Sequence, residues 1–335
     1  MRITRDLLHK FARETVRKRK RSEPDLHAAY LVGSLLDDEP LLGGTTDIDI
    51  ILVHKYQVPV PRECVSLTPE ISLDIFHKLT DDFDQPRALR EDPWMGYPLT
   101  RNHILLYDTD HWLEFIQASV SAEFHRPDYV LTRVQTLLNT ARENWFSMID
   151  TPSKTHLAWL NLYFINLSLA ANALSGLIGP PLTRRRFMLT FDHRTEQLAI
   201  DQMLVGFKGL MGFRDSHADS LTDWTSGLSE DLLYLAEKTE APIHLSNPRH
   251  AYYLDAIKAL VESGTPSHAS WPLLRTWLDI RLAIPLPAPG DDAWHDCLES
   301  LGLTEEATEE KTEALDAYLD QVDILIENWA EAYGV

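Results

Sequence analysis

Cysteine is almost absent from this chain, because Cys64 and Cys297 are the only two and lie far apart. Neither a disulfide framework nor a cysteine-bound zinc site can therefore organise the fold. Long hydrophobic runs are also missing, and no segment reaches the ~20 consecutive apolar residues typical of a membrane span. The first residues lack the apolar core and small-residue cleavage site of a secretory signal. These absences predict a cytoplasmic protein with no membrane partner.

Positive charge is scarce. The 31 Lys and Arg residues face 51 Asp and Glu residues, which gives a formal net charge of −20. A protein that tracks nucleic acid needs a basic surface to neutralise phosphates, so a nucleic-acid partner is not expected. An acidic surface attracts cationic ligands, which makes a cationic small molecule a reasonable acceptor or partner. The alternative is that the charge only keeps the protein soluble. The oligomeric state is left open by the sequence.

The familiar nucleotide-binding motifs are missing. There is no Gly-Lys-Ser/Thr of a Walker loop and no G-x-G-x-x-G dinucleotide fingerprint, and the 14 histidines include no HExxH pair. The 335 residues are nevertheless enough for two domains. A nucleotide site, if there is one, must therefore be built in another way.

The hydrophobic pattern of the sequence changes from strand-like to helical near residue 111. Before it, apolar and β-branched runs predict strands at 27–33, 47–53, 71–77 and 102–107, after an amphipathic helix at 3–20. Beyond it, helical periodicity dominates, and helices are predicted at 128–148, 156–177, 195–208 and 304–332, with a proline-rich linker at 285–290. The fold class predicted is α+β, with a small sheet domain at 1–112 and an all-helical domain at 113–335.

Three aspartates carry the chemistry in this pattern. Asp47 and Asp49 lie two residues apart on a predicted strand, so both side chains project from one face. Asp74 lies centrally on the next predicted strand and projects beside them if the two strands pair. Clustered carboxylates repel one another unless cations neutralise them. Mg²⁺ is the natural cation, since it favours one or two carboxylates together with substrate phosphates.

Gly33-Ser34 supplies a complementary feature, separated from Asp47 by a gap of twelve residues. A glycine at the end of a strand allows the backbone to approach a phosphate closely, and exposed amides after it form an anion-binding concavity. The serine hydroxyl adds a further donor. Each feature alone is common, and the combination of all of them in this order is what indicates a site.

The segment AYLVGSLLDDEPLLGGTTDIDIILVHK resembles the signature of the polymerase-beta-like nucleotidyltransferase superfamily, and ISLDIFHK resembles its following strand with a third carboxylate. The resemblance covers roughly residues 25–110. It implies a small mixed-sheet catalytic domain, and the helical remainder is similar to the layout of aminoglycoside nucleotidyltransferases.

The resemblance also implies roles. Asp47 and Asp49 would bind two Mg²⁺ ions, with Asp74 as a third ligand or as a general base. Gly33 and Ser34 would hold the β- and γ-phosphates of a nucleoside triphosphate. The expected reaction transfers a nucleoside monophosphate, AMP from ATP, to a hydroxyl of a small acceptor such as an aminoglycoside-like antibiotic, and releases pyrophosphate.

Two alternatives stay open. The acceptor could be a protein side chain, as in minimal nucleotidyltransferase antitoxins, and Arg186 and His193 have the spacing of the motif in the matching toxins. The domain could also be a nucleotide-binding regulator without catalysis. Retention of all three carboxylates favours an enzyme, since a binder does not need both metal ligands.

Overall fold

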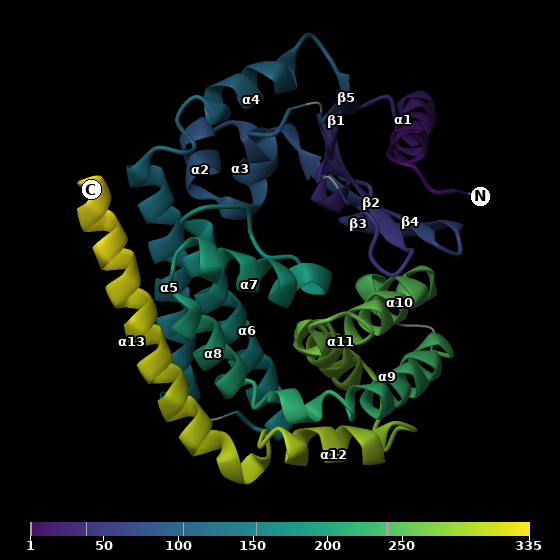
Figure 1. The fold of residues 1–335 in the computed structure, drawn as a ribbon. Helices are drawn as coiled ribbons and strands as arrows, with labels where there is room; N and C mark the ends of the chain where they lie inside the picture. Colours follow the sequence, from purple (N-terminus) through teal and green to yellow (C-terminus); the bar gives the residue numbers. More distant parts are fainter. Residues whose placement is uncertain (1, 38, 103, 152, 239–240) are drawn as a thin grey trace. The chain divides into compact units, whose positions relative to one another are not determined.

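The chain is α+β, as the sequence predicts, with a five-stranded mixed sheet in its N-terminal half and mostly helices beyond it (Figure 1). The structure, a computed structural model, describes residues 2–37, 39–102, 104–151, 153–238 and 241–335. Two compact units can be distinguished. Unit 1 comprises Met1–Tyr129 and Ile243–Asp255, and unit 2 comprises Val130–Pro242 and Ala256–Val335. Unit 1 extends to Tyr129, whereas the sequence predicted a boundary at residue 112. No sequence pattern predicted that residues 243–255 return to unit 1.

The sheet of unit 1 has the strand order β3-β4-β2-β1-β5. Strands β2 and β4 run parallel, and the other neighbouring pairs are antiparallel. The parallel pairing sets Asp49 directly opposite Asp74. The strands are β1 (Leu26–Val32), β2 (Thr46–His54), β3 (Arg62–Thr68), β4 (Ile71–Leu79) and β5 (Leu105–Asp108).

Four of these strands were predicted from the sequence, and β3 was not. Strand β3 lies at the edge of the sheet and carries Arg62, Glu63, Ser66 and Thr68, so it shows neither an apolar run nor a clear alternation. The antiparallel pairing with β4 is what holds these residues as a strand. The predicted strand at 102–107 corresponds to β5, which begins only at Leu105, and His103 lies outside the described residues.

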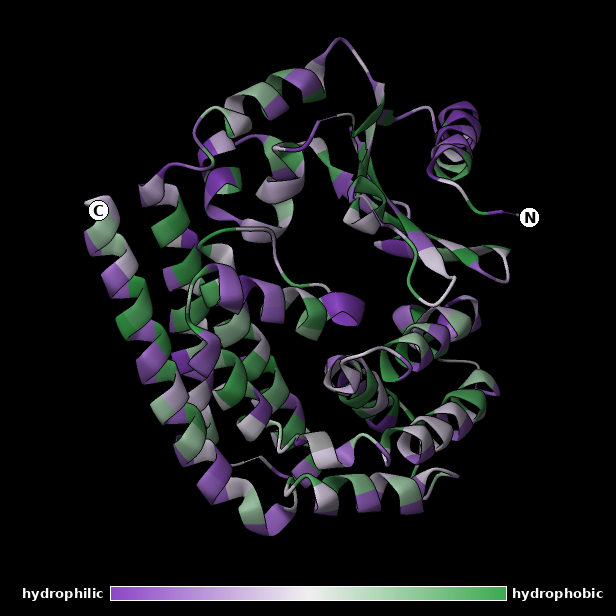
Figure 2. Cartoon of the chain, in the orientation of Figure 1, coloured by the Kyte–Doolittle hydropathy of each residue, from purple (hydrophilic) through white to green (hydrophobic). Residues whose placement is uncertain are grey.

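One face of the sheet is covered by α1 (Arg5–Ser22). The helix begins at Thr4, whose hydroxyl accepts a hydrogen bond from the Leu7 amide, and most of it is hydrophilic in Figure 2. Its apolar residues Leu8, Ala12 and Val16 are buried against the even-numbered side chains of β2. This is the stripe expected of a surface helix on a sheet.

The opposite face is covered by three short helices, α2 (Pro86–Glu91), α3 (Pro93–Leu99) and α4 (Trp112–Ser121). Ile51 and Val53 of β2 pack there with apolar residues of these helices. Side chains alternate along a strand. Asp47 and Asp49 therefore lie on the same face as Ile51, whereas His54 lies on the face covered by α1.

Unit 2 is helical. Its helices are α5 (Pro127–Asp150), α6 (His156–Gly176), α7 (Phe187–Gln197), α8 (Asp201–Leu210), α9 (Leu221–Ala236), α10 (His250–Val261), α11 (Ser270–Ala283), α12 (Asp291–Ser300) and α13 (Thr308–Tyr333), where the first residues of α5 and α10 still belong to unit 1. Hydrophobic and hydrophilic residues alternate along α13 in Figure 2. Aromatic rings fill the core, and Phe187 stacks on Trp271 with the ring centroids 4.0 Å apart.

The single helix predicted at 195–208 is wrong. Helix α7 ends at Gln197, and α8 begins at Asp201. Between them Ala199 adopts φ 56°, a left-handed conformation that interrupts a right-handed helix. The break lets both helices turn aromatic side chains into one core, where Phe191 and Phe207 lie 5.2 Å apart. Periodicity alone cannot reveal such a break, because both helices have the same apolar spacing.

Among the described residues, α6 alone is long and apolar enough by composition to span a membrane. Of its most apolar window, 61% is buried inside the structure. Burial of this kind is what a core helix of a helical domain shows. The helix itself was predicted from periodicity at 156–177, and the structure confirms it.

Asp231 is the most demanding buried charge of unit 2. It is fully buried and accepts hydrogen bonds from Trp277 Nε1 at 2.8 Å, Gly290 N at 2.8 Å and the Arg281 guanidinium at 3.1 Å. Replacing one partner of a buried ion pair leaves the other charge poorly compensated. We expect Asp231→Asn to lower the free energy of unfolding by about 3 kcal/mol, measured by denaturant titration.

Glu230→Gln is the matched control, since Glu230 is the neighbouring residue and is exposed. That change should stay within about 0.5 kcal/mol. Equal losses in the two variants would show that the buried network contributes nothing specific.

Candidate functional site

The three aspartates singled out in the sequence lie together. Asp47 and Asp49 project from β2 and Asp74 from β4, and one carboxylate oxygen of each lies within 4.8 Å of the other two. Asp47 and Asp74 are almost fully buried, and Asp49 is partly buried. The cluster follows from the parallel register, which places β2 and β4 side by side with their acids on one face.

Two arginines bind the cluster from outside these strands. Arg62 of β3 forms a bidentate pair with Asp74, with Nε and an Nη at 2.8 and 2.6 Å from its two oxygens. Arg249 ends the 3₁₀ turn Asn247–Arg249 in the returning segment of unit 1 and is itself buried. Its guanidinium lies 2.6 Å from Asp74 and 3.0 Å from Asp47. One guanidinium thus bridges the two strands.

The electrostatics of the cluster are unbalanced. Three carboxylates share two guanidiniums, and no described residue donates a hydrogen bond to the Asp49 carboxylate. Burial, followed by repulsion from Asp47 and Asp74, raises the pKa of Asp49 well above its ordinary value. Burial works to lower the pKa of Arg249, but anionic neighbours, Asp47 and Asp74 among them, raise it overall, so this guanidinium is charged. One negative charge in the cluster remains uncompensated.

Gly33 and Ser34 lie beside the acids, at the start of the 3₁₀ turn Gly33–Leu36 that follows β1. Gly33 has φ +74°, a conformation that favours glycine. A Cβ built on it would lie 1.9 Å from Oδ2 of Asp49, so the turn passes directly against this carboxylate. The first amides of a helical turn have no acceptor within it and can bind an anion.

Two buried hydroxyls at the cluster lack hydrogen-bond partners among the described residues. Ser34 Oγ is one, in the turn that touches Asp49. Ser72 Oγ is the other, on β4 opposite Asp47 and on the same face as Asp74. A buried hydroxyl without a partner costs about 1–3 kcal/mol, and its presence in a native site calls for a missing partner.

Sequence reasoning missed Arg62, Arg249 and Ser72. Arg62 and Ser72 lie on strands, and their proximity to the acids needs only the β3–β4 and β2–β4 pairings. Arg249 lies 175 residues from Asp74 in the chain. No local pattern marks it. The sequence indicates only that three clustered carboxylates require cations, and two of these cations are the guanidiniums of Arg62 and Arg249.

No protein-family model matches this chain, and no curated protein matches its sequence.

Gly33→Ala tests the contact between the turn and the acid. The variant should lose about 1–2 kcal/mol from the left-handed conformation and a further loss from the clash with Asp49. Gly44→Ala is the matched control, since Gly44 has φ +75° and nothing lies within 4 Å of its added Cβ. Thermal or chemical unfolding should show the larger loss for Gly33→Ala. Equal losses would contradict the close approach.

Arg249→Gln tests the role of the buried guanidinium. Without it the three carboxylates keep only Arg62, and we expect a loss of about 3 kcal/mol in the free energy of unfolding. Millimolar Mg²⁺ should restore more stability to this variant than to the wild-type protein. Arg87→Gln removes an exposed arginine of α2 that pairs with Glu91, and should change stability little. An unaffected Arg249→Gln variant would show that the cluster does not need its charge.

Proposed function

We propose that this protein is a metal-dependent nucleotidyltransferase, as the resemblance of the segment around Gly33-Ser34, Asp47 and Asp49 implies. The observation that carries the proposal is the meeting of three carboxylates, with excess negative charge, at a glycine turn whose serine hydroxyl is buried without a partner among the described residues. An acidic cluster needs a cation, and an unpartnered hydroxyl beside it needs an acceptor. A magnesium-bound nucleoside triphosphate provides both.

The donor set fits a hard divalent cation. Its ligands are carboxylate oxygens, which Mg²⁺ prefers. Bound Mg²⁺ would neutralise phosphate charge and activate the attacking hydroxyl. With both guanidiniums in place, one divalent ion already offsets the remaining negative charge. The second ion implied by the resemblance requires Arg249 to leave Asp47 and Asp74, and the freed guanidinium then suits a phosphate oxygen.

The turn and the hydroxyls would hold the phosphates. The amides of the turn that follows Gly33 would bind an oxyanion, while the space that a side chain on Gly33 would need is taken by the Asp49 carboxylate. Ser34 Oγ would donate to the β- or γ-phosphate. Such contacts fix the α-phosphate for in-line attack, and this chemistry depends mainly on positioning and charge neutralisation.

The environment of Asp74 favours a ligand or positioning role over that of general base. Both of its oxygens already accept hydrogen bonds from guanidiniums, and Arg62 occupies both. The guanidiniums of Arg62 and Arg249 thus already occupy the carboxylate that a general base would need free. Asp49, whose carboxylate accepts no hydrogen bond from the described residues, is the more available of the two.

The acceptor we propose is a small hydroxyl-bearing molecule, with cationic compounds favoured by the net charge of −20. AMP from ATP is the nucleotide we expect to be transferred. The cytoplasm is the expected location.

The test is incubation with Mg²⁺ and each α-labelled nucleoside triphosphate, with and without a panel of aminoglycosides and lincosamides, following label transfer and pyrophosphate release. We expect transfer to one small acceptor and a loss of at least about 10³-fold in Asp49→Asn. Asp84→Asn, an exposed acid of unit 1, is the control and should keep full activity.

The outcomes separate the alternatives. Label found on protein instead of a small molecule would favour the antitoxin-like function. Binding of triphosphate without turnover would favour a regulator. Neither turnover nor Mg²⁺-dependent nucleotide binding would overturn the proposal.

A further inference from the structure

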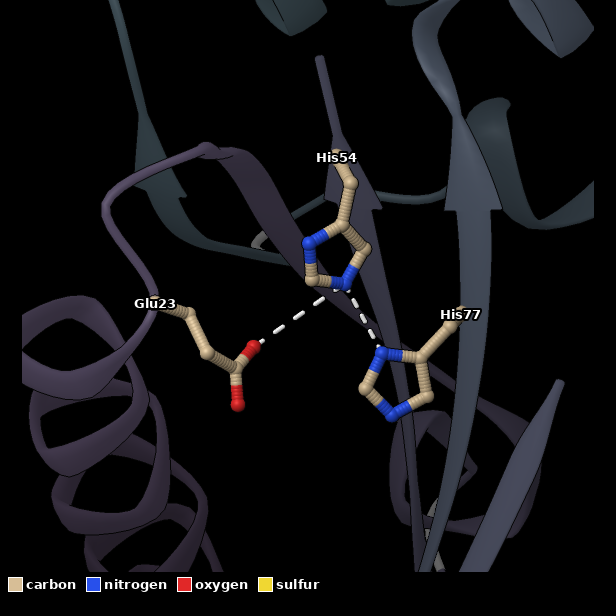
Figure 3. Close-up of side chains that lie close together, drawn as sticks. All are labelled: Glu23, His54 and His77. Carbon is tan, nitrogen blue, oxygen red and sulfur yellow. Dashed lines mark hydrogen bonds and ion pairs between the residues drawn. The ribbon is translucent and has the colours of Figure 1, made fainter. Parts of the chain in front are cut away.

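A second cluster of ligating side chains lies on the other face of the same sheet. His54 at the end of β2, His77 on β4 and Glu23 just after α1 turn toward one another (Figure 3). His54 Nε2 lies 2.8 Å from His77 Nδ1 and 3.9 Å from Glu23 Oε2. Both histidine side chains are fully buried, and that of Glu23 is 16% exposed. None of these residues has a part in the proposed nucleotide site.

The outer nitrogens of both histidines face carboxylates. His77 Nε2 lies 2.8 Å from Glu63 Oε1, and His54 Nδ1 lies 3.5 Å from Asp25 Oδ1. A carboxylate accepts hydrogen bonds from N–H groups, and a neutral histidine carries only one N–H. If both outer nitrogens hold the protons, the two inner nitrogens present lone pairs to each other across 2.8 Å. Such an arrangement is repulsive unless a cation lies between them.

Hydrogen bonding within the described part of the chain leaves the cluster incomplete. Glu23 Oε2 is buried and has no hydrogen-bond partner there, although Glu23 Oε1 accepts one from Arg19 at 2.8 Å. His54 Nδ1 is likewise buried without a hydrogen bond.

We propose that Glu23, His54 and His77 form a binding site for a divalent transition metal ion, with Zn²⁺ the favoured ion. The ligands would be Glu23 Oε2, His54 Nε2 and His77 Nδ1. Two imidazoles and one carboxylate form a recognised zinc ligand set that leaves a fourth position for water. The two imidazole nitrogens are softer ligands than carboxylate oxygen and suit zinc. The aspartate cluster offers only carboxylate oxygens, which suit Mg²⁺.

The spacing suits tetrahedral zinc. Zn–N bonds of about 2.0–2.1 Å place two ligands of a tetrahedron roughly 3.3 Å apart. The observed separations of 2.8 and 3.9 Å lie on either side of this value. These two pairs each need a shift of about half an ångström to reach it. The third pair, Glu23 Oε2 and His77 Nδ1, lies within 4.8 Å.

The surrounding carboxylates match those that usually support a metal-bound histidine. Such a histidine donates its other N–H to a carboxylate or a carbonyl, which fixes the ring and raises its basicity. Glu63 is placed to do this for His77, and Asp25 faces His54. Arg19 bridges Glu23 and Glu63, at 2.8 and 2.5 Å, and so orients a ligand and a supporting residue together.

The bound ion would connect three elements of unit 1: the end of α1, β2 and β4. It would lie on the face of the sheet covered by α1, because side chains alternate along β2 and that of His54 points to the opposite face from those of Asp47 and Asp49. A metal at this place stabilises the fold and need not take part in nucleotide transfer. Its occupancy can therefore be measured without any assay of activity.

The experiment is equilibrium dialysis of the full chain against Zn²⁺, after its metal has been removed with a chelator. Millimolar Mg²⁺ is kept in the buffer to occupy the carboxylate cluster. We expect one zinc per chain by elemental analysis, and Co²⁺ in its place should give the visible absorption of a tetrahedral site. His77→Gln and Glu23→Gln should each weaken binding at least tenfold. Glu63→Gln should weaken it by about 10–100-fold, since Glu63 supports a ligand.

Two controls guard against a trivial result. Asp49→Asn should keep its zinc, because it alters only the opposite face. His111→Gln, an exposed histidine paired with Glu114, should also keep it. Circular dichroism checks that each variant is folded, and Glu23→Gln leaves both buried histidines in place should His77→Gln fail to fold. Substoichiometric zinc in the wild type, or zinc lost from Asp49→Asn but kept in Glu23→Gln, would overturn the proposal and leave a proton-sharing histidine pair.

Discussion

Repulsion among Asp47, Asp49 and Asp74 is the constraint on which the arrangement of unit 1 depends. The parallel pairing of β2 and β4 brings the three carboxylates together, and cations must then be supplied to hold them. Arg62 comes from the adjacent edge strand. Arg249 comes from a segment that leaves the helical part of the sequence and belongs to unit 1 over residues 243–255. Its guanidinium, paired with Asp47 and Asp74, ties that segment to the sheet.

The part of the site that sequence reveals is the part set by local geometry. Asp47 and Asp49 share a face because a strand has a period of two, and that conclusion needs no knowledge of the fold. Asp74 required one assumption, that its strand pairs with β2, and the register supports it. Gly33 was predicted to approach a phosphate, which stays a prediction. The structure shows instead a close contact with Asp49 and a positive φ, and both depend on the absence of a side chain. The metal and nucleotide roles of these residues stay predictions.

What the sequence could not reveal depends on contacts between distant segments. Strand β3 exists because β4 offers it an edge, and its polar composition hides it from any search for apolar alternation. Arg249 follows an unremarkable Asn-Pro, and nothing near it indicates a carboxylate partner. The break at Ala199 between α7 and α8 lets aromatic residues of both helices pack in one core. Helical periodicity does not reveal it, because both helices have the same apolar spacing.

The two faces of the sheet meet the same demand in different ways. At the aspartate cluster two guanidiniums offset two of the three carboxylates, and a second added ion would have to compete with Arg249. At Glu23, His54 and His77 the nearest guanidinium, Arg19, is already shared between Glu23 and Glu63, and Glu23 Oε2 stays without a hydrogen bond in the part of the chain that the structure describes. A metal there displaces no guanidinium. If the two proposed ions bind, the histidine cluster should hold its ion more tightly than the aspartates hold theirs. An exchangeable ion at the aspartates would suit the proposed nucleotide transfer, in which the ion would arrive with the triphosphate.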